Sequence, residues 1–255
     1  MASGVAPAAL VTGGAQRIGG AIATALARAG YAVVIHANRS ASVAAELCRD
    51  IVAAGGKAEF ITGDLSNHEA VLAAVPRAVA AVGPLTLLVN NAGEFEPDAI
   101  GSLDRARFDR QFAVNLRAPL FLAEKFAEQV PAGTDASIVN LVDQRVYKLT
   151  PQFISYTLTK SALHTATITL AQALAPRVRV NAVAPGPTLP SPRQDMAEFA
   201  AQAATLPMAR GPTPADIAAA VVYLAGASSV TGVTIAVDGG QHVAWQTPDA
   251  AGITE

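Results

Sequence analysis

Short apolar runs alternate with longer amphipathic or Ala-rich segments along the whole chain. Strands that are apolar on both faces and are joined by helices form parallel sheets covered on both sides. The pattern therefore predicts an α/β fold in residues 1–255: one domain with a doubly wound, Rossmann-type parallel sheet of about seven strands and helices on both faces. The expected strands are residues 8–12, 31–37, 57–63, 85–91, 137–142, 178–185 and 233–240.

Two segments depart from this alternation. Residues 187–214 carry several prolines around one short apolar stretch, which predicts a lid insertion beside a binding crevice. Residues 241–255 follow the last expected strand and form a tail without a further strand or helix. The tail holds the only tryptophan, Trp245, a side chain too large and apolar to be left in water, so we expect it to dock on protein.

Composition narrows the class of protein. The chain is 51% hydrophobic and 15% charged with a formal net charge of −2, so no basic field favours nucleic acid. The single cysteine, Cys48, excludes an internal disulfide and fits a reducing compartment. No signal peptide and no apolar run of the roughly 20 residues needed to span a membrane is evident, so a cytoplasmic protein is expected. His68, His164 and His242 lack metal-ligand spacing, so no metal is expected.

Tyr156 and Lys160 are the first candidates for chemistry. Their i, i+4 spacing places both on one face of a helix, where an ammonium beneath a phenol lowers the phenol's pKa toward working pH. Tyr156 is therefore a candidate proton donor. Asp143 lies thirteen positions earlier in the chain.

A glycine-rich turn between the first strand and the first helix indicates a dinucleotide site. Such a turn lets the backbone approach a pyrophosphate at a helix N-terminus, and an arginine within it can hold an oxyanion. A cofactor without a 2′-phosphate would call for an acid after the second strand, and the chain has none there, so NADP(H) is preferred. The residues concerned are Gly13, Gly14, Arg17 and Gly19 in the turn, and His36, Arg39 and Ser40 after the second strand.

Five motifs together resemble the short-chain dehydrogenase/reductase family, in that family's order and at its spacings. They are TGGAQRIG at 12–19, NNAG at 90–93, Asn115 within AVNLRAP, the segment from Asp143 to Lys160, and NAVAPGP at 181–187. The resemblance extends from about Ala8 to Gly240. Asp143 stands where the family normally has a serine, and this variant resembles the pteridine reductases.

The resemblance implies a role for each matching residue. Asn115 resembles the asparagine that kinks the central helix and holds a proton-relay water, and Phe95 occupies the place of an aromatic residue that stacks a pterin on the nicotinamide. Gly93 departs from the serine of some pteridine reductases. The implied catalytic residues are Asp143, Tyr156, Lys160 and Asn115; the implied substrate-binding residues are Phe95, Asp143 and Tyr156. The implied cofactor-binding residues are Gly13, Arg17, Ile18, Gly19, His36, Arg39, Ser40, Asp64, Leu65, Asn91, Ala92, Gly93, Tyr156, Lys160, Pro185 and Gly186.

Asp143 decides the expected substrate. An ionised carboxylate only accepts hydrogen bonds, so it repels a carbonyl oxygen and suits a ring or exocyclic N–H. We therefore expect an NADPH-dependent reductase of pteridines, acting on dihydropterin, dihydromonapterin-like compounds or dihydrofolate. The alternative is a carbonyl reductase of ketones, sugars or 3-ketoacyl chains. A protonated Asp143, or one that guides a water to Tyr156, also stays open. The resemblance further implies a homotetramer.

Overall fold

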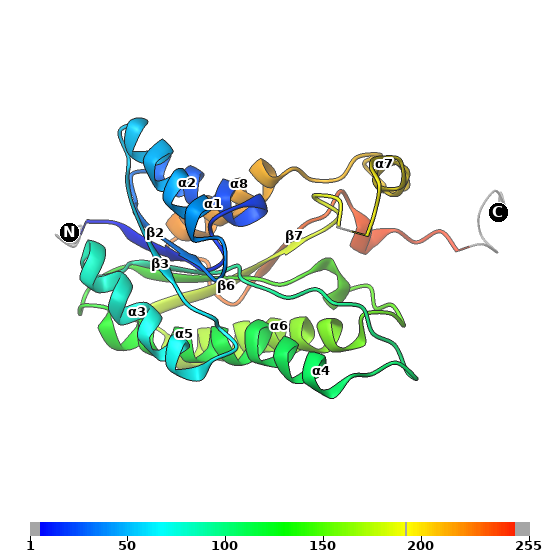
Figure 1. Ribbon diagram of the computed structural model, residues 1–255, viewed down its shortest axis with the longest axis horizontal. Helices are drawn as coiled ribbons and strands as arrows, with labels where there is room; N and C mark the ends of the chain where they lie inside the picture. Colours follow the sequence, from blue (N-terminus) through cyan, green and yellow to red (C-terminus); the bar gives the residue numbers. More distant parts are fainter. Residues whose placement is uncertain (1–5, 192, 248–255) are drawn as a thin grey trace.

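The computed structural model describes residues 6–191 and 193–247 and confirms the predicted sheet (Figure 1). Seven strands form one sheet in the order β3-β2-β1-β4-β5-β6-β7, and every neighbouring pair is parallel. The strands are β1 Ala8–Val11, β2 Ala32–Ala37, β3 Lys57–Thr62, β4 Leu87–Asn90, β5 Ala136–Leu141, β6 Val178–Pro185 and β7 Thr234–Val237.

Helices cover both faces of this sheet. Figure 1 shows α1, α2 and α8 on one face and α3, α4, α5 and α6 on the other, with α7 standing apart near the carboxyl ends of the strands. The helices are α1 Arg17–Arg28, α2 Ala41–Ala53, α3 His68–Val82, α4 Arg105–Phe112, α5 Ala118–Gln129, α6 Ile154–Leu174, α7 Met196–Ala204 and α8 Pro214–Gly226. A π-helical segment, η1 Ala113–Arg117, joins α4 to α5, and two 3-10 turns are η2 Gln144–Val146 and η3 Gln241–Val243. The turn η3 corrects the expectation of a tail without helix.

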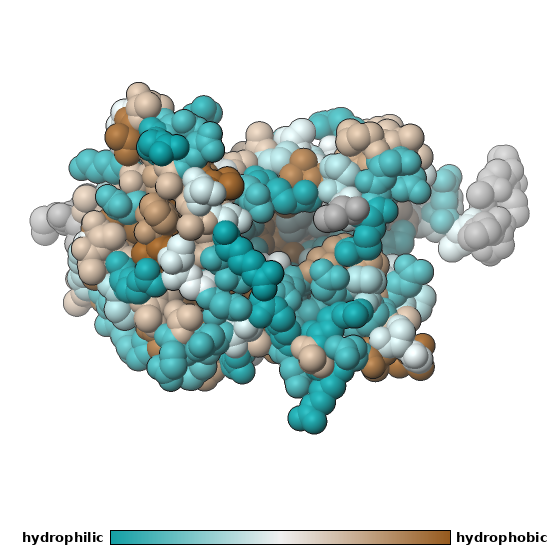
Figure 2. All heavy atoms as spheres, viewed as in Figure 1, coloured by the Kyte–Doolittle hydropathy of each residue, from teal (hydrophilic) through white to brown (hydrophobic). Residues whose placement is uncertain are grey.

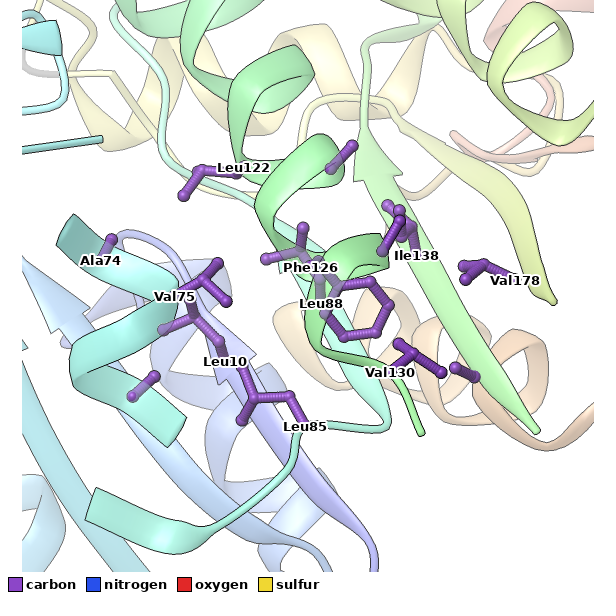
Figure 3. Close-up of a cluster of buried hydrophobic side chains, with 14 of the residues drawn as sticks. Leu10, Ala74, Val75, Leu85, Leu88, Leu122, Phe126, Val130, Ile138 and Val178 are labelled. Carbon is purple, nitrogen blue, oxygen red and sulfur yellow. The ribbon is translucent and has the colours of Figure 1, made fainter. Parts of the chain in front are cut away.

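The sheet divides the core into two apolar layers because successive side chains of a strand point to opposite faces. Leu10 and Leu88 join the layer beneath α3 and α5, whereas Val11 and Val89 join the layer beneath α1, α2 and α8. Figure 3 shows the first layer, where Phe126 of α5 lies among strand residues, and its side chain is fully buried.

The outer surface is mixed in polarity, with apolar residues scattered among polar ones on the face that Figure 2 shows. Among the described residues, no helix is long and apolar enough to cross a membrane. Residues 187–214, the segment predicted to form a lid, contain the short helix α7, which begins with a capping box between Asp195 and Glu198.

Strand order reverses between β1 and β4, which are neighbours in the sheet although two strands separate them along the chain. At such a switch point the loops after the two strands diverge and leave a crevice at the carboxyl edge of the sheet. The fold therefore predicts where a ligand binds before any side chain is considered.

Candidate active site

A cleft of about 1090 Å³ lies at this edge of the sheet. Ligand pockets for one drug-sized molecule measure roughly 300 to 1,000 Å³, so the cleft has room for a dinucleotide and a small substrate. All the sequence-predicted site residues line it except Gly14 of the glycine turn and Asn115, which is buried. Lid residues such as Thr188 and Phe199 also line the cleft.

In the glycine turn after β1, the backbone at Gly13 and the backbone at Gly19 lie so close together that Gly19 has no room for a side chain. A Cβ on Gly19 would lie 2.2 Å from the Gly13 carbonyl oxygen, and Gly13 has a φ of +59°. Asn91 Nδ2 donates to the carbonyl oxygens of Thr12 and Gly13 at 2.9 and 3.0 Å. The loop after β4 therefore holds the turn in place, which gives Asn91 a structural reason to lie here.

The N-terminus of α1 opens into the cleft without a cap. Its N-cap residue, Gln16, makes no side-chain capping bond, and the first turn contains no acidic residue. Free N–H groups and the positive end of the helix dipole suit a pyrophosphate. Arg17 was predicted to hold phosphate; in the structure its Nη2 donates to the carbonyl oxygen of Pro190 at 3.1 Å, so it also reaches the lid.

His36 and Arg39 play different parts at the end of β2. Gly13 N donates to His36 Nδ1 at 3.4 Å, and His36 Nε2 lies 3.1 Å from the Gly63 carbonyl oxygen. Burial lowers the pKa of His36 to about 4, so its ring is neutral near pH 7 and braces the glycine turn. Arg39 is exposed and lines the cleft at the end of β2.

Asp64 belongs to an ion network that the sequence did not predict. Arg110 Nη1 lies 3.1 Å from Asp64 Oδ2, while Arg110 Nε lies 2.6 Å from Glu94 Oε1. Burial raises the pKa of Asp64, but hydrogen bonds from Arg110 and Ser66 outweigh it and lower that pKa to about 2. Helix α3 is capped by the side chain of Asn67. The network ties the loops after β3 and β4 to α4.

Asp143, Tyr156 and Lys160 meet on the floor of the cleft. The Tyr156 hydroxyl donates to Asp143 Oδ2 at 3.0 Å, and the Arg145 backbone N–H donates to Asp143 Oδ1 at 2.8 Å. Lys160 Nζ donates to the Leu141 carbonyl oxygen at 2.6 Å and lies 5.8 Å from the centroid of the Tyr156 ring. The three predicted residues therefore lie together, but the phenol bonds the carboxylate.

This arrangement corrects the expected effect of Lys160 on Tyr156. Burial raises the pKa of Tyr156 well above its usual range, and the charge and hydrogen bond of Asp143 raise it further. Burial also raises the pKa of Asp143, against the lowering effect of hydrogen bonds from Arg145 and Tyr156. Burial lowers the pKa of Lys160 to about 8, although the nearby Asp143 charge opposes this shift. The carboxylate and the phenol thus form one hydrogen-bonded pair in which the phenol is the donor.

An aromatic wall stands beside this pair. Phe95 stacks on Phe153 with ring centroids 4.2 Å apart and an interplanar angle of 7°, and its centroid lies 4.7 Å from that of Tyr156. Arg145 and Arg193 place their guanidinium carbons 5.1 to 5.8 Å from the centroids of the two phenylalanine rings. The sequence did not predict Phe153, Arg145 or Arg193 as site residues. Aromatic and charged residues in loops follow no hydrophobic periodicity from which their place in a site could be predicted.

Asn115 lies within the π-helical segment η1 and has no exposed surface. Its Oδ1 accepts from Glu94 N at 2.8 Å, and its Nδ2 donates to the Glu94 carbonyl oxygen at 2.9 Å and to Thr159 Oγ1 at 3.2 Å. Asn115 therefore fixes the loop after β4 against α6. A Cβ on Gly93 would lie 3.6 Å from Lys160 Nζ, so this loop passes directly over the lysine.

The fold and this site define a Rossmann-type oxidoreductase. Residues 13–242 match the family described as enoyl-(acyl carrier protein) reductase, and General stress protein 39 of Bacillus subtilis is 34% identical over 245 residues, 92% of this chain and 84% of that protein. The chain belongs to the short-chain dehydrogenase/reductase family.

Two solved structures are similar over almost the whole chain. They are FolM alternative dihydrofolate reductase 1 from Brucella canis and from Brucella suis, both in complex with NADP. Each is 50% identical with a TM-score of 0.93, covering 96% of this chain and 97% and 98% of the respective neighbour. Their cofactor is the one that the sequence predicts for this chain.

Proposed function

We propose that the protein is an NADPH-dependent reductase of pteridines, with dihydropterins and dihydrofolate as its substrate class. The observation that carries the proposal is the hydrogen bond from Tyr156 to Asp143, where the family normally has a serine. The identity of 50% to two alternative dihydrofolate reductases supports it. Asp143, Tyr156, Lys160 and Asn115 are proposed as the catalytic set.

The residues fit NADP(H). The uncapped N-terminus of α1 suits the pyrophosphate, exposed Arg39 suits the 2′-phosphate, and Gly186, where a Cβ would lie 2.6 Å from Asp238 Cα, suits the nicotinamide. NADPH, when bound, supplies the hydride. Ser40, Asp64, Leu65, Ala92 and Pro185 complete the proposed contacts because they line the same cleft.

The chain's own residues supply the proton. Reduction of a C=N bond needs one proton at nitrogen, and the pair formed by Asp143 and Tyr156 holds one on the phenol, which is 3.0 Å from the carboxylate. Loss of that proton leaves negative charge on the pair, which the Lys160 ammonium nearby stabilises. Solvent then returns the proton. A pterin also presents N–H groups that a carboxylate accepts, which a simple ketone lacks.

The direct test compares substrate classes with purified wild-type protein. NADPH oxidation is followed at equal concentrations of a dihydropterin, dihydrofolate and a panel of ketones, sugars and 3-ketoacyl compounds. We expect kcat/KM to be highest for the dihydropterin or dihydrofolate. A higher value for a ketone, sugar or ketoacyl compound would instead establish the carbonyl reductase.

Arg39→Ala is expected to weaken NADPH binding by about 1.5 to 3 kcal/mol, roughly 10- to 150-fold in Kd, because it removes a charge-assisted hydrogen bond to the 2′-phosphate. NADH, which lacks this phosphate, is expected to bind the variant and the wild type equally. Fluorescence titration measures both constants. The control is Arg49→Ala, an exposed arginine on α2 that does not line the cleft. Equal losses for NADH and NADPH would contradict the assignment.

The tail and residues 187–214 both expose large apolar side chains, among them Met196 and Met208. Trp245 is 73% exposed, and its neighbour Ala244 is held by a 3.0 Å bond from Lys148 Nζ to its carbonyl oxygen. Tail residues 248–255 lie outside the described part of the chain. We propose a homotetramer in which residues 241–255 pack on a neighbouring subunit, and lid residues 187–214 close over the substrate.

Trp245→Ala is expected to reduce the tetramer to smaller species, because the indole is too apolar to face water without a partner. Light scattering gives the mass. Val52→Ala serves as control, because Val52 is a similarly exposed apolar residue of α2 on a helix away from the tail. A tetramer that survives Trp245→Ala unchanged would refute the docking of the tail.

A further inference from the structure

Helix α6, which carries Tyr156 and Lys160, begins in an unusual way. Its N-cap residue is Phe153, with a φ of +58° and a ψ of 47°, and the phenylalanine side chain provides no capping bond. Helices α3, α4 and α7 each begin with a residue whose side chain caps its own helix, namely Asn67, Asp104 and Asp195. The first turn of α6 needs a cap from elsewhere.

Asp98 supplies that cap from the loop between β4 and α4. Its Oδ1 and Oδ2 lie 3.1 and 3.3 Å from Ser155 N, and Oδ2 also accepts from the Ser155 hydroxyl. The Phe153 backbone N–H donates to the Asp98 carbonyl oxygen at 2.8 Å. Asp98 is 6% exposed and Ser155 fully buried, so water does not replace these bonds. A carboxylate at a helix N-terminus is also stabilised by the helix dipole.

The junction between Asp98 and the start of α6 also places the aromatic wall beside the Asp143–Tyr156 pair. The left-handed backbone at Phe153 is unfavourable for a bulky residue, and such strain persists only where the surrounding structure enforces it. Here it turns the Phe153 ring flat onto Phe95, which lies three residues before Asp98 in the same loop. Ser155, the residue bonded by Asp98, directly precedes Tyr156. The bonds from Asp98 to Ser155 and Phe153, called the clip below, thus hold both the aromatic wall and the Tyr156 phenol.

We propose that Asp98 is a positioning residue: by capping α6 from the β4–α4 loop it holds the Phe95–Phe153 wall in contact with Tyr156 and so fixes the aromatic surface that a planar substrate meets. Its link to planar substrates rests on the proposed pteridine reductase function. Asp98 itself lies outside the cleft lining and acts through Ser155 and Phe153.

Asp98→Ala tests the clip against a matched control. Asp104→Ala removes an aspartate cap from α4 in the same loop, where the bond to Arg107 N is 2.8 Å and exposed. Both variants are expected to melt at lower temperature than wild type. Only Asp98→Ala is expected to raise KM for the dihydropterin, about tenfold, with the NADPH Kd within about twofold of wild type, because a loosened wall affects the planar substrate alone. Asp98→Asn keeps one oxygen acceptor, so its KM is expected to lie between the values of wild type and Asp98→Ala.

Three outcomes decide the proposal. If Asp98→Ala lowers the melting temperature but leaves KM at the wild-type value, the clip is only structural and the proposal is overturned. If Asp98→Ala does not fold, Ser155→Ala replaces it: the change removes the hydroxyl bonded to Asp98 and leaves both rings of the wall in place, so a stable protein with raised KM supports the proposal, and an unchanged KM overturns it. Wild-type turnover of dihydropterin tests the proposed function first, and the variant-to-wild-type ratio of KM is then measured on whichever planar substrate the wild type reduces.

Discussion

Tyr156→Phe is expected to lower kcat for the dihydropterin by about 10²- to 10⁴-fold, the range that a positioned general acid contributes. The substitution keeps the ring, which is 8% exposed and packs edge-on against Phe95, but it removes the only hydroxyl bonded to Asp143 Oδ2 in the described residues. NADPH affinity is expected to stay within about twofold, because the proposed phosphate contacts lie at α1 and Arg39. Single-turnover kinetics and a fluorescence titration measure the two quantities.

Thr157→Val serves as the control for this experiment. Thr157 is the next residue of α6, is also buried, and its Oγ1 has no hydrogen-bond partner among the described residues. Removing that hydroxyl is therefore expected to leave kcat near the wild-type value. If Tyr156→Phe retains the wild-type rate, the proton does not come from the phenol, and Asp143 alone becomes the donor.

The fold could be predicted because its signal is local and repeated. Each strand is a short apolar run and each crossover a longer helical pattern, so the alternation specifies a parallel sheet without any knowledge of distant contacts. The positions of Tyr156 and Lys160 follow from the same periodicity, since an i, i+4 pair on a helix shares a face wherever the helix lies. Gly13 and Gly19 belong to this predictable part, because the turn between strand and helix determines them.

The partners of the site residues could not be predicted in the same way. Arg110 bridges Asp64 and Glu94 across 46 and 16 positions of sequence, and Asp98 meets Ser155 across 57. Such pairs depend on how loops fold over a finished sheet, and a loop has no period from which a partner can be read. Phe153 illustrates this: only its left-handed backbone reveals why a phenylalanine stands before the helix.

The error over Lys160 has a similar origin. The i, i+4 spacing places the lysine near the phenol, but it does not say which acceptor the ammonium reaches. In the structure the Leu141 carbonyl oxygen at the end of β5 accepts a hydrogen bond from Lys160, and Asp143 accepts one from the Tyr156 hydroxyl. Asp143 thus raises the pKa of the phenol, which is opposite to the effect expected from Lys160, and the proposed acid–base chemistry rests on Asp143.

Asp143→Asn is expected to lower dihydropterin turnover about 10²-fold and to shift the alkaline limb of the pH profile of kcat/KM to lower pH. Burial, then the charge and hydrogen bond of Asp143, hold the pKa of Tyr156 above its usual range. An amide keeps the shape but removes the charge, so the pKa of the phenol falls. The donor acts only while protonated, and activity is therefore lost at a lower pH than in wild type. Because the wild-type pKa lies above the usual tyrosine value of about 10, initial rates are measured from about pH 7 to about pH 12.

Asp143→Ser separates this electrostatic role from substrate choice. A serine hydroxyl donates a hydrogen bond, which a carbonyl oxygen accepts, whereas the pterin loses the acceptor for its N–H group. The ratio of kcat/KM for ketone to kcat/KM for dihydropterin is expected to rise by about two orders of magnitude, because one gain and one loss each contribute about 1.5 kcal/mol. Glu96→Gln removes a carboxylate from the rim of the same cleft and is expected to leave the ratio unchanged. An unchanged ratio in Asp143→Ser would show that Asp143 does not choose between the substrates, and the pteridine assignment would lose the observation on which it rests.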